Sequence, residues 1–175
     1  MRLRSLFLIA ASLLVASRAW CGHTLTPQEQ KIVSEWIERH PAYRIATDAD
    51  CKCAEDIQQM KAGYGGDWKP VPDYHPYIAT GDFNSDGVPD FAVVVVDGSK
   101  PIKNFSLLVF NGPFGAKSAS PAFVESGLDL SYQGLSFGPP RPKPYRLLVG
   151  PFESDNSWIL VPKGHTYKVQ VNQGD

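Results

Sequence analysis

The sequence predicts an α+β fold in which two amino-terminal helices pack on a mainly antiparallel β-sheet arranged as a meander. Apolar residues recur at helical spacing up to residue 61, whereas β-branched and aromatic runs separated by Gly, Pro and Asn turns follow from residue 77. Short connections between successive strands favour antiparallel neighbours, and the helices would then cover one face of the sheet. The length of 175 residues fits one domain.

The first 19 residues have the pattern of a secretory signal peptide. Basic residues come first, an apolar run over residues 6–15 follows, and small residues stand at a cleavage site after Ala19. The run is shorter than the about 20 residues that span a bilayer, so we expect no membrane anchor after signal removal. Residues 20–175 would then be a single extracytoplasmic domain, either periplasmic or secreted.

The charge balance of the exported chain argues against nucleic acid as a partner. Signal removal would take three arginines away, leaving 14 of the 17 basic residues against 18 acidic ones. The resulting net charge is about −4, and it offers no basic face for a phosphate backbone.

The cysteines are Cys21, Cys51 and Cys53, and an oxidising compartment favours a disulfide over metal binding. Cleavage after Ala19 leaves all three, so that Cys21 can pair with either of the others. Cleavage after Cys21 leaves the other two, whose spacing by one residue closes a small, strained ring. A redox role is disfavoured, since such sites place two residues between their cysteines.

The first helix is predicted to begin at the capping box formed by residues 26–29. Pro27 occupies the first helical position, where its missing N–H costs nothing. The helix ends by His40, because Pro41 disfavours helical backbone in the residue before it. Its apolar stripe consists of Ile32, Val33, Trp36 and Ile37.

A shorter second helix is expected to start from a cap at Asp48 or Asp50 and to stop at Gly63. The stretch that follows, residues 63–76, is rich in Gly, Pro and aromatic residues. In an exposed loop, Trp68 and Tyr74 would contact a glycan or a peptide of a partner protein. The alternative is that these rings cover the edge of the sheet or fill the space beneath the helices.

The connection over residues 81–90 carries oxygen side chains at the spacing of a calcium loop. Positions one, three, five and nine are Asp82, Asn84, Asp86 and Asp90, and the carbonyl of Val88 at position seven would be a fifth ligand. Gly87 at position six suits the sharp turn that such a loop needs. Carboxylate and amide oxygens favour a hard cation over zinc or copper.

The residues around this loop distinguish it from an EF-hand. Position twelve is Val93 in place of a bidentate Glu, and the flanking stretches 77–80 and 91–96 have strand composition in place of helical composition. We therefore predict a calcium-clasped hairpin over residues 77–96.

Residues 77–115 resemble the FG-GAP or VCBS repeat family, whose blades carry a Gly-Asp-x-[Asn/Asp]-x-Asp-Gly-x-x-Asp loop between two strands. The resemblance implies that Asp82, Asn84, Asp86, the Val88 carbonyl and Asp90 bind calcium. Such blades assemble into propellers, and one blade in this length cannot close a ring. Residues 144–156 echo 76–87 with the first and last ligand positions replaced, by either duplication or coincidence.

Further strands are expected at residues 105–110, 122–125, 134–137, 145–149, 157–161 and 167–171. No Gly-rich phosphate loop or His-Glu-x-x-His motif occurs in the sequence. The sequence thus favours an exported calcium-binding protein with a structural calcium, which contacts a protein or glycan of the cell envelope through the aromatic loop around Trp68 or through the exposed sheet. The alternative is a small extracytoplasmic hydrolase, or an inhibitor of one, since converging carboxylates leave no linear signature.

Overall fold

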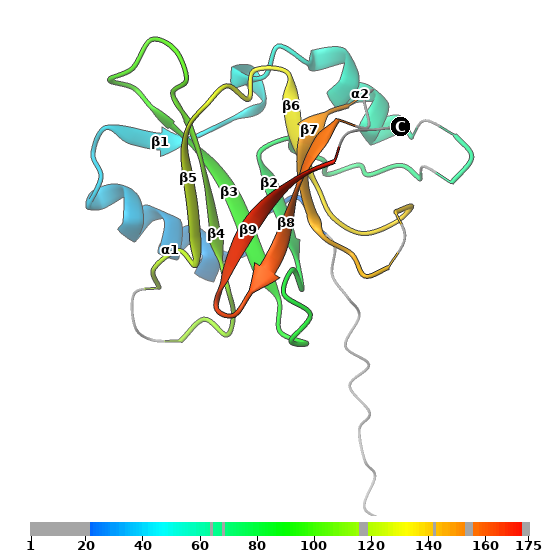
Figure 1. Ribbon diagram of the computed structural model, residues 1–175. Helices are drawn as coiled ribbons and strands as arrows, with labels where there is room; N and C mark the ends of the chain where they lie inside the picture. Colours follow the sequence, from blue (N-terminus) through cyan, green and yellow to red (C-terminus); the bar gives the residue numbers. More distant parts are fainter. Residues whose placement is uncertain are drawn as a thin grey trace, which may run out of the picture.

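The computed structural model describes residues 22–63, 65–67, 69–115, 119–141, 143–152 and 156–172. The predicted signal peptide, Cys21 and Trp68 lie outside these residues. Figure 1 shows two β-sheets that face each other, with one helix beside the first sheet and the other near the second.

The described residues form nine strands, two α-helices and one short 3-10 helix. The helices are α1 (Pro27–Glu38), η1 (Asp48–Asp50) and α2 (Ala54–Ala62). The strands are β1 (Tyr43–Ile45), β2 (Ile78–Gly81), β3 (Asp90–Asp97), β4 (Phe105–Phe110), β5 (Phe123–Leu128), β6 (Gln133–Ser136), β7 (Leu147–Pro151), β8 (Ser157–Lys163) and β9 (Thr166–Asn172).

Strand β3 lies at the centre of the first sheet, whose order is β1-β3-β4-β5 with β2 also paired to β3. Strand β1 pairs with residues 95–97 and β2 pairs with residues 90–93, so the two share one edge of β3 end to end. The second sheet is a four-stranded meander in the order β6-β7-β8-β9. All pairings in both sheets are antiparallel.

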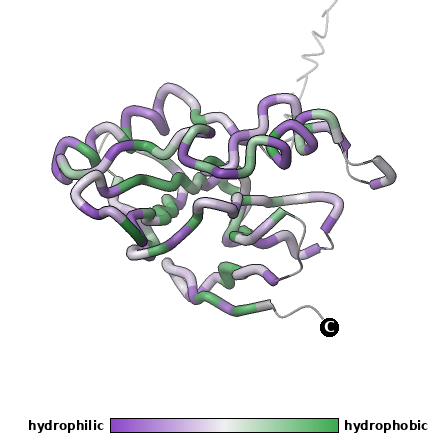
Figure 2. Tube along the Cα trace, turned by 90° about the horizontal axis from the view of Figure 1, so that it is seen from above, coloured by the Kyte–Doolittle hydropathy of each residue, from purple (hydrophilic) through white to green (hydrophobic). Residues whose placement is uncertain are grey.

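Every residue of β3 and β4 is buried, which requires a cover on each face of the first sheet. The odd-numbered residues from Phe91 to Val95 pack against the apolar stripe of α1. The even-numbered residues from Ala92 to Val96 belong to a larger core that the second sheet closes. Figure 2 shows hydrophobic stretches gathered in the strands and hydrophilic ones along the helices and outer turns.

The predicted fold class, two amino-terminal helices packed on one antiparallel sheet, is wrong. The protein is mostly β-sheet, with two antiparallel sheets, and the two short helices of the described residues do not form a common layer. Helix α1 covers the outer face of the first sheet, whereas Ile57 of α2 packs into the core between the sheets. The physical reason is that β3 and β4 are apolar on both faces, so the later strands fold as a second sheet over the face that α1 leaves open.

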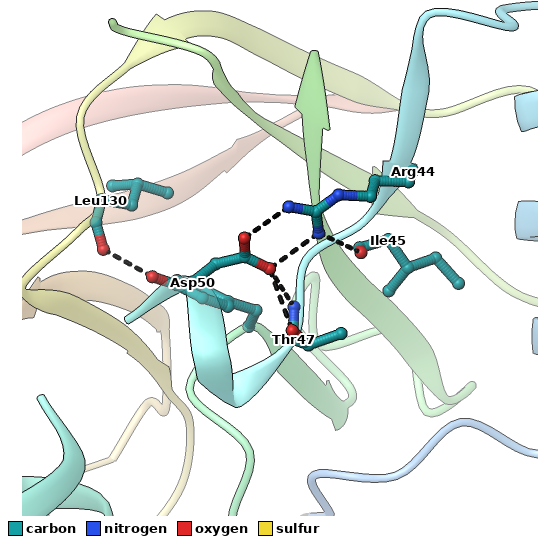
Figure 3. Close-up of polar contacts among 6 residues, drawn as sticks. Arg44, Ile45, Thr47, Asp50 and Leu130 are labelled. Carbon is teal, nitrogen blue, oxygen red and sulfur yellow. Dashed lines mark hydrogen bonds and ion pairs between the residues drawn. The ribbon is translucent and has the colours of Figure 1, made fainter. Parts of the chain in front are cut away.

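A salt bridge links β1, a strand of the first sheet, to the 3-10 helix η1 that follows it. Arg44 donates to both carboxylate oxygens of Asp50, at 2.8 and 2.5 Å, and Asp50 also accepts from the backbone N–H and the hydroxyl of Thr47 (Figure 3). The hydrogen bond from Arg44 lowers the pKa of Asp50 to about 2. Nearby, the Tyr77 hydroxyl donates to the Leu130 carbonyl at 2.9 Å and so links the start of β2 to the segment before β6.

We predict that Asp50→Asn lowers the free energy of unfolding at pH 7 by about 1 kcal/mol, a modest loss because the Arg44 side chain is 55% exposed. A carboxyl group with a depressed folded-state pKa contributes stability above its unfolded pKa of about 4 and loses it as the pH falls through its folded value. Urea denaturation at pH 7, 4 and 2 should show the wild type losing more stability than the variant on acidification. Equal losses would contradict this role for the pair, and Glu55→Gln, at an exposed position of α2, is the control.

Candidate metal loop between β2 and β3

The candidate loop is the connection between β2 and β3, where Gly81 pairs with Asp90 across the antiparallel ladder. Strands therefore flank it on both sides, as the sequence predicts. Gly87 has a φ of 85° and Ser85 a φ of 65°, so the loop passes twice through the left-handed region. This coiling brings alternate side chains to the same side of the loop.

Three of the predicted ligands meet around one backbone amide. Asp82 Oδ1 and Asn84 Oδ1 both accept from the N–H of Asp86, at 3.0 and 2.9 Å. The Asn84 amide donates to Asp86 Oδ2 at 2.9 Å, and Asp86 Oδ1 accepts from the N–H of Val88 at 2.8 Å. Asp82, Asn84 and Asp86 thus form a convergent group of oxygen side chains, which we call the upper cluster.

Asp90 lies beneath the upper cluster with none of its surface exposed. Its Oδ2 accepts from the N–H groups of Phe83 and Asn84, at 2.8 and 3.3 Å, and its Oδ1 accepts from the N–H of Gly112 at 3.0 Å. The hydroxyl of Tyr167 on β9 lies 3.5 Å from Oδ2. Asp90 therefore joins the loop and the segment after β4, and Tyr167, whose hydroxyl donates to Asn111 Oδ1 at 2.7 Å, lies close to it from the second sheet.

The electrostatics of the loop favour a cation. The pKa of Asp90 is raised to about 6, chiefly by burial and to a smaller extent by the charge of Asp86. The hydrogen bonds from the backbone N–H groups lower this pKa and offset part of the increase. The pKa of Tyr167 is raised by burial first and then by the charges of Asp90, Asp86 and Asp82. Most groups that donate to the loop carboxylates are neutral backbone N–H groups, which leave the negative charge uncompensated.

The donor chemistry fits calcium through the upper cluster. Two carboxylates, one amide oxygen and the Val88 carbonyl are the oxygen ligands that this ion prefers. Each carboxylate oxygen that accepts one N–H keeps a second lone pair for an ion. In the part of the chain that the structure describes, no three His, Cys, Asp or Glu side chains form a group that could hold a metal, so the three aspartates of the loop do not make such a group by themselves.

Sequence reasoning missed the residues that support the loop from a distance. Phe83, between two predicted ligands, is fully buried and packs edge-on against Phe137, with ring centroids 5.0 Å apart. Gly112 and Tyr167 reach Asp90 from other strands' ends. Only the alternation of polar and apolar residues at 82–84 signals the inward direction of Phe83, and no local pattern signals the other two.

The structure does not leave Tyr74 available to a partner. Its side chain is 1% exposed, its ring lies against His23 and Phe152, and its hydroxyl is 3.4 Å from the Leu135 carbonyl. The alternative that the aromatic rings of this stretch fill space in the fold therefore holds for Tyr74. Trp68 lies outside the described residues.

Cys51 and Cys53 form a disulfide in the segment before α2, and both are buried. This is the pairing of closely spaced cysteines among the alternatives that the sequence leaves open. Asp48, just before them, accepts from His75 Nδ1 at 2.8 Å and lies 3.6 Å from Lys61 Nζ. These contacts of Asp48 tie α2 to the segment before β2.

Comparison of the chain with protein-family models, with curated proteins and with solved structures gave no match. The likeness to FG-GAP or VCBS repeats therefore rests on the residues of the loop themselves. Of the helices in the described residues, none has the length and apolar character that crossing a membrane requires.

We predict that Asp90→Ala destabilises the protein by about 2 to 4 kcal/mol with calcium absent, because one buried and two partly buried backbone N–H groups lose their acceptor. Urea denaturation in EDTA measures the loss. Asp86→Ala, at an exposed position of the same loop, should cost less than about 1 kcal/mol under the same conditions. Equal losses in the two variants would show that Asp90 has no special structural role.

Proposed function

We propose that this protein is an exported, calcium-stabilised binding protein that contacts a protein or glycan of the cell envelope. The observation that carries the calcium proposal is the convergence of Asp82, Asn84 and Asp86 around the Asp86 amide, above the buried carboxylate of Asp90. The ligands would be Asp82, Asn84 and Asp86 of the upper cluster together with the Val88 carbonyl.

The position of the loop supports a structural role for the ion. The loop leads directly into β3, the strand on which the first sheet is built. Calcium there would neutralise carboxylates that otherwise repel one another, and it would fix the β2–β3 register in which Gly81 faces Asp90. An ion that binds only the folded chain raises its stability by mass action.

We predict that calcium raises the melting temperature of the wild type and that Asp82→Ala or Asp86→Ala removes most of this increase. At a free calcium concentration about 100-fold above the dissociation constant, the gain is about 2.7 kcal/mol. Differential scanning calorimetry in millimolar calcium and in EDTA provides the measurement. Glu55→Ala, which removes an exposed carboxylate on α2, should retain the full calcium response.

An unchanged melting temperature in EDTA and calcium, with no heat of binding by titration calorimetry, would show that the loop is a turn that binds no calcium.

The envelope partner requires a separate experiment. The mature protein, immobilised and exposed to envelope extract, should retain a partner in calcium and lose it when Asp82→Ala replaces the wild type. Equal retention by both proteins would show that partner binding does not depend on calcium binding at the loop.

A further inference from the structure

Strand β9 is an outer strand of the second sheet, and among the described strands it pairs with β8 alone (Figure 1). The register between the two continues without a shift from the pair Lys163–Thr166 to the pair Ser157–Asn172. The strand contains no proline. One side of its backbone therefore presents a regular row of N–H and C=O groups, which is a template for a further strand.

The turn between β8 and β9 determines which residues face this free edge. A two-residue turn, whose glycine has a φ of 61°, joins the strands at the pair Lys163–Thr166. The pair that closes such a turn exchanges both of its backbone hydrogen bonds, so Thr166 directs its N–H and C=O toward β8. Every second residue after it does the same. The residues that direct these groups toward the free edge are therefore Tyr167, Val169 and Val171.

The side chains of these three residues share the face of β9 that is turned toward the first sheet, but they are covered unequally. Tyr167 is 5% exposed and belongs to the core between the sheets. Val169 is 39% exposed and Val171 is 59% exposed. An added strand would shield both valines from water and would also satisfy the row of backbone groups.

The other outer strands have features that prevent pairing with a further strand. Strand β5 has a register shift beside β4, and Gly127 within it has a φ of 75°. The N–H of Leu135 in β6 donates to the Pro76 carbonyl, and the N–H of Thr80 in β2 donates to the Gly22 carbonyl. Strand β1 is only three residues long. Irregular, covered and short edges resist pairing, and β9 is the outer strand of the described residues that has none of these features.

The sequence of β9 is complementary to itself when two copies run antiparallel. The register that uses all three outward residues places Val169 opposite its own counterpart and Tyr167 opposite Val171 of the second copy. On the other face Lys168 then lies opposite Gln170, so the one charged side chain of the strand meets an amide in place of another ammonium. A shift by two residues would leave one outward residue of each copy without a partner in β9.

We propose that two copies of this protein associate through β9 in antiparallel orientation, so that their two four-stranded sheets join into one. The second copy is the occupant of this edge because the side chains match in the register that pairs every outward backbone group. The dimer goes beyond the proposed function and depends neither on calcium nor on an envelope partner.

Sedimentation equilibrium of the mature protein over about 5 to 500 µM should show a monomer–dimer equilibrium, both in EDTA and in calcium. Gln170→Lys places ammonium groups opposite each other and should weaken the dimer about fivefold, whereas Gln170→Glu faces Lys168 and should strengthen it by about the same factor. Gln58→Lys and Gln58→Glu, at an exposed position of α2, are matched controls that should leave the equilibrium unchanged. A monomer at every concentration, or the same effect of both charges at residue 170, would overturn the proposal.

A second experiment tests the register. Val169→Cys should form a disulfide between two copies on mild oxidation, because facing residues of a hydrogen-bonded pair have their Cα atoms about 5.5 Å apart. Val171→Cys faces Tyr167 in this register and should not cross-link above the level of the wild type, although residue 171 is more exposed. Equal cross-linking of the two variants, or none in either, would contradict the register.

Amide hydrogen exchange tests the same edge in the unaltered protein. The amides of Val169 and Val171 should be protected at high protein concentration and should exchange quickly on dilution. Those of Lys168 and Gln170 point toward β8 and should stay protected at both concentrations. A dimer with unprotected amides at Val169 and Val171 would place the contact on another face, and protection that appears only with envelope extract would assign the edge to a different protein. Either result would overturn the proposal.

Discussion

The burial of β3 on both faces is the constraint on which the rest of this structure depends. A strand that is buried at every position needs two covers, and this chain provides them as α1 on one side and a second sheet on the other. The edge of β3 that β4 leaves free is shared by β1 and β2. The two polar ends of the strand, Asp90 and Asp97, are buried as well, and each accepts hydrogen bonds from backbone N–H groups.

Local signals in the sequence predicted most of the elements, although β1 was not expected and α2 begins at Ala54 after an N-cap at Cys53, in place of the predicted cap at Asp48 or Asp50. The capping box at Thr26 and Glu29 is present with both of its reciprocal hydrogen bonds, and α1 ends before Pro41. The strands over residues 90–97 and 105–110 follow from their β-branched and aromatic composition. The division of the strands into two sheets was not predicted, because the same antiparallel turns connect strands within one sheet and between two.

In the candidate site too, contacts within the loop could be predicted from the sequence, whereas contacts made through the tertiary fold could not. Spacing alone placed Asp82, Asn84 and Asp86 together, since a coiled loop fixes the direction of its alternate residues. The environment of Asp90 depends on Gly112 and Tyr167, which reach it through the tertiary fold and have no counterpart in the local pattern. Tyr74 illustrates the converse case, because Gly and Pro neighbours suggest an exposed loop although the ring is enclosed.

The position of Asp90 has a consequence for how the protein unfolds locally. Its carboxylate accepts hydrogen bonds from backbone amides of both the β2–β3 loop and the segment after β4, and it lies near a tyrosine of the last strand. Fraying of β9 would admit water to that carboxylate and release both amides together. We therefore expect the amide hydrogens of Phe83 and Gly112 to exchange with solvent at similar rates, since both lose their acceptor when this carboxylate is exposed.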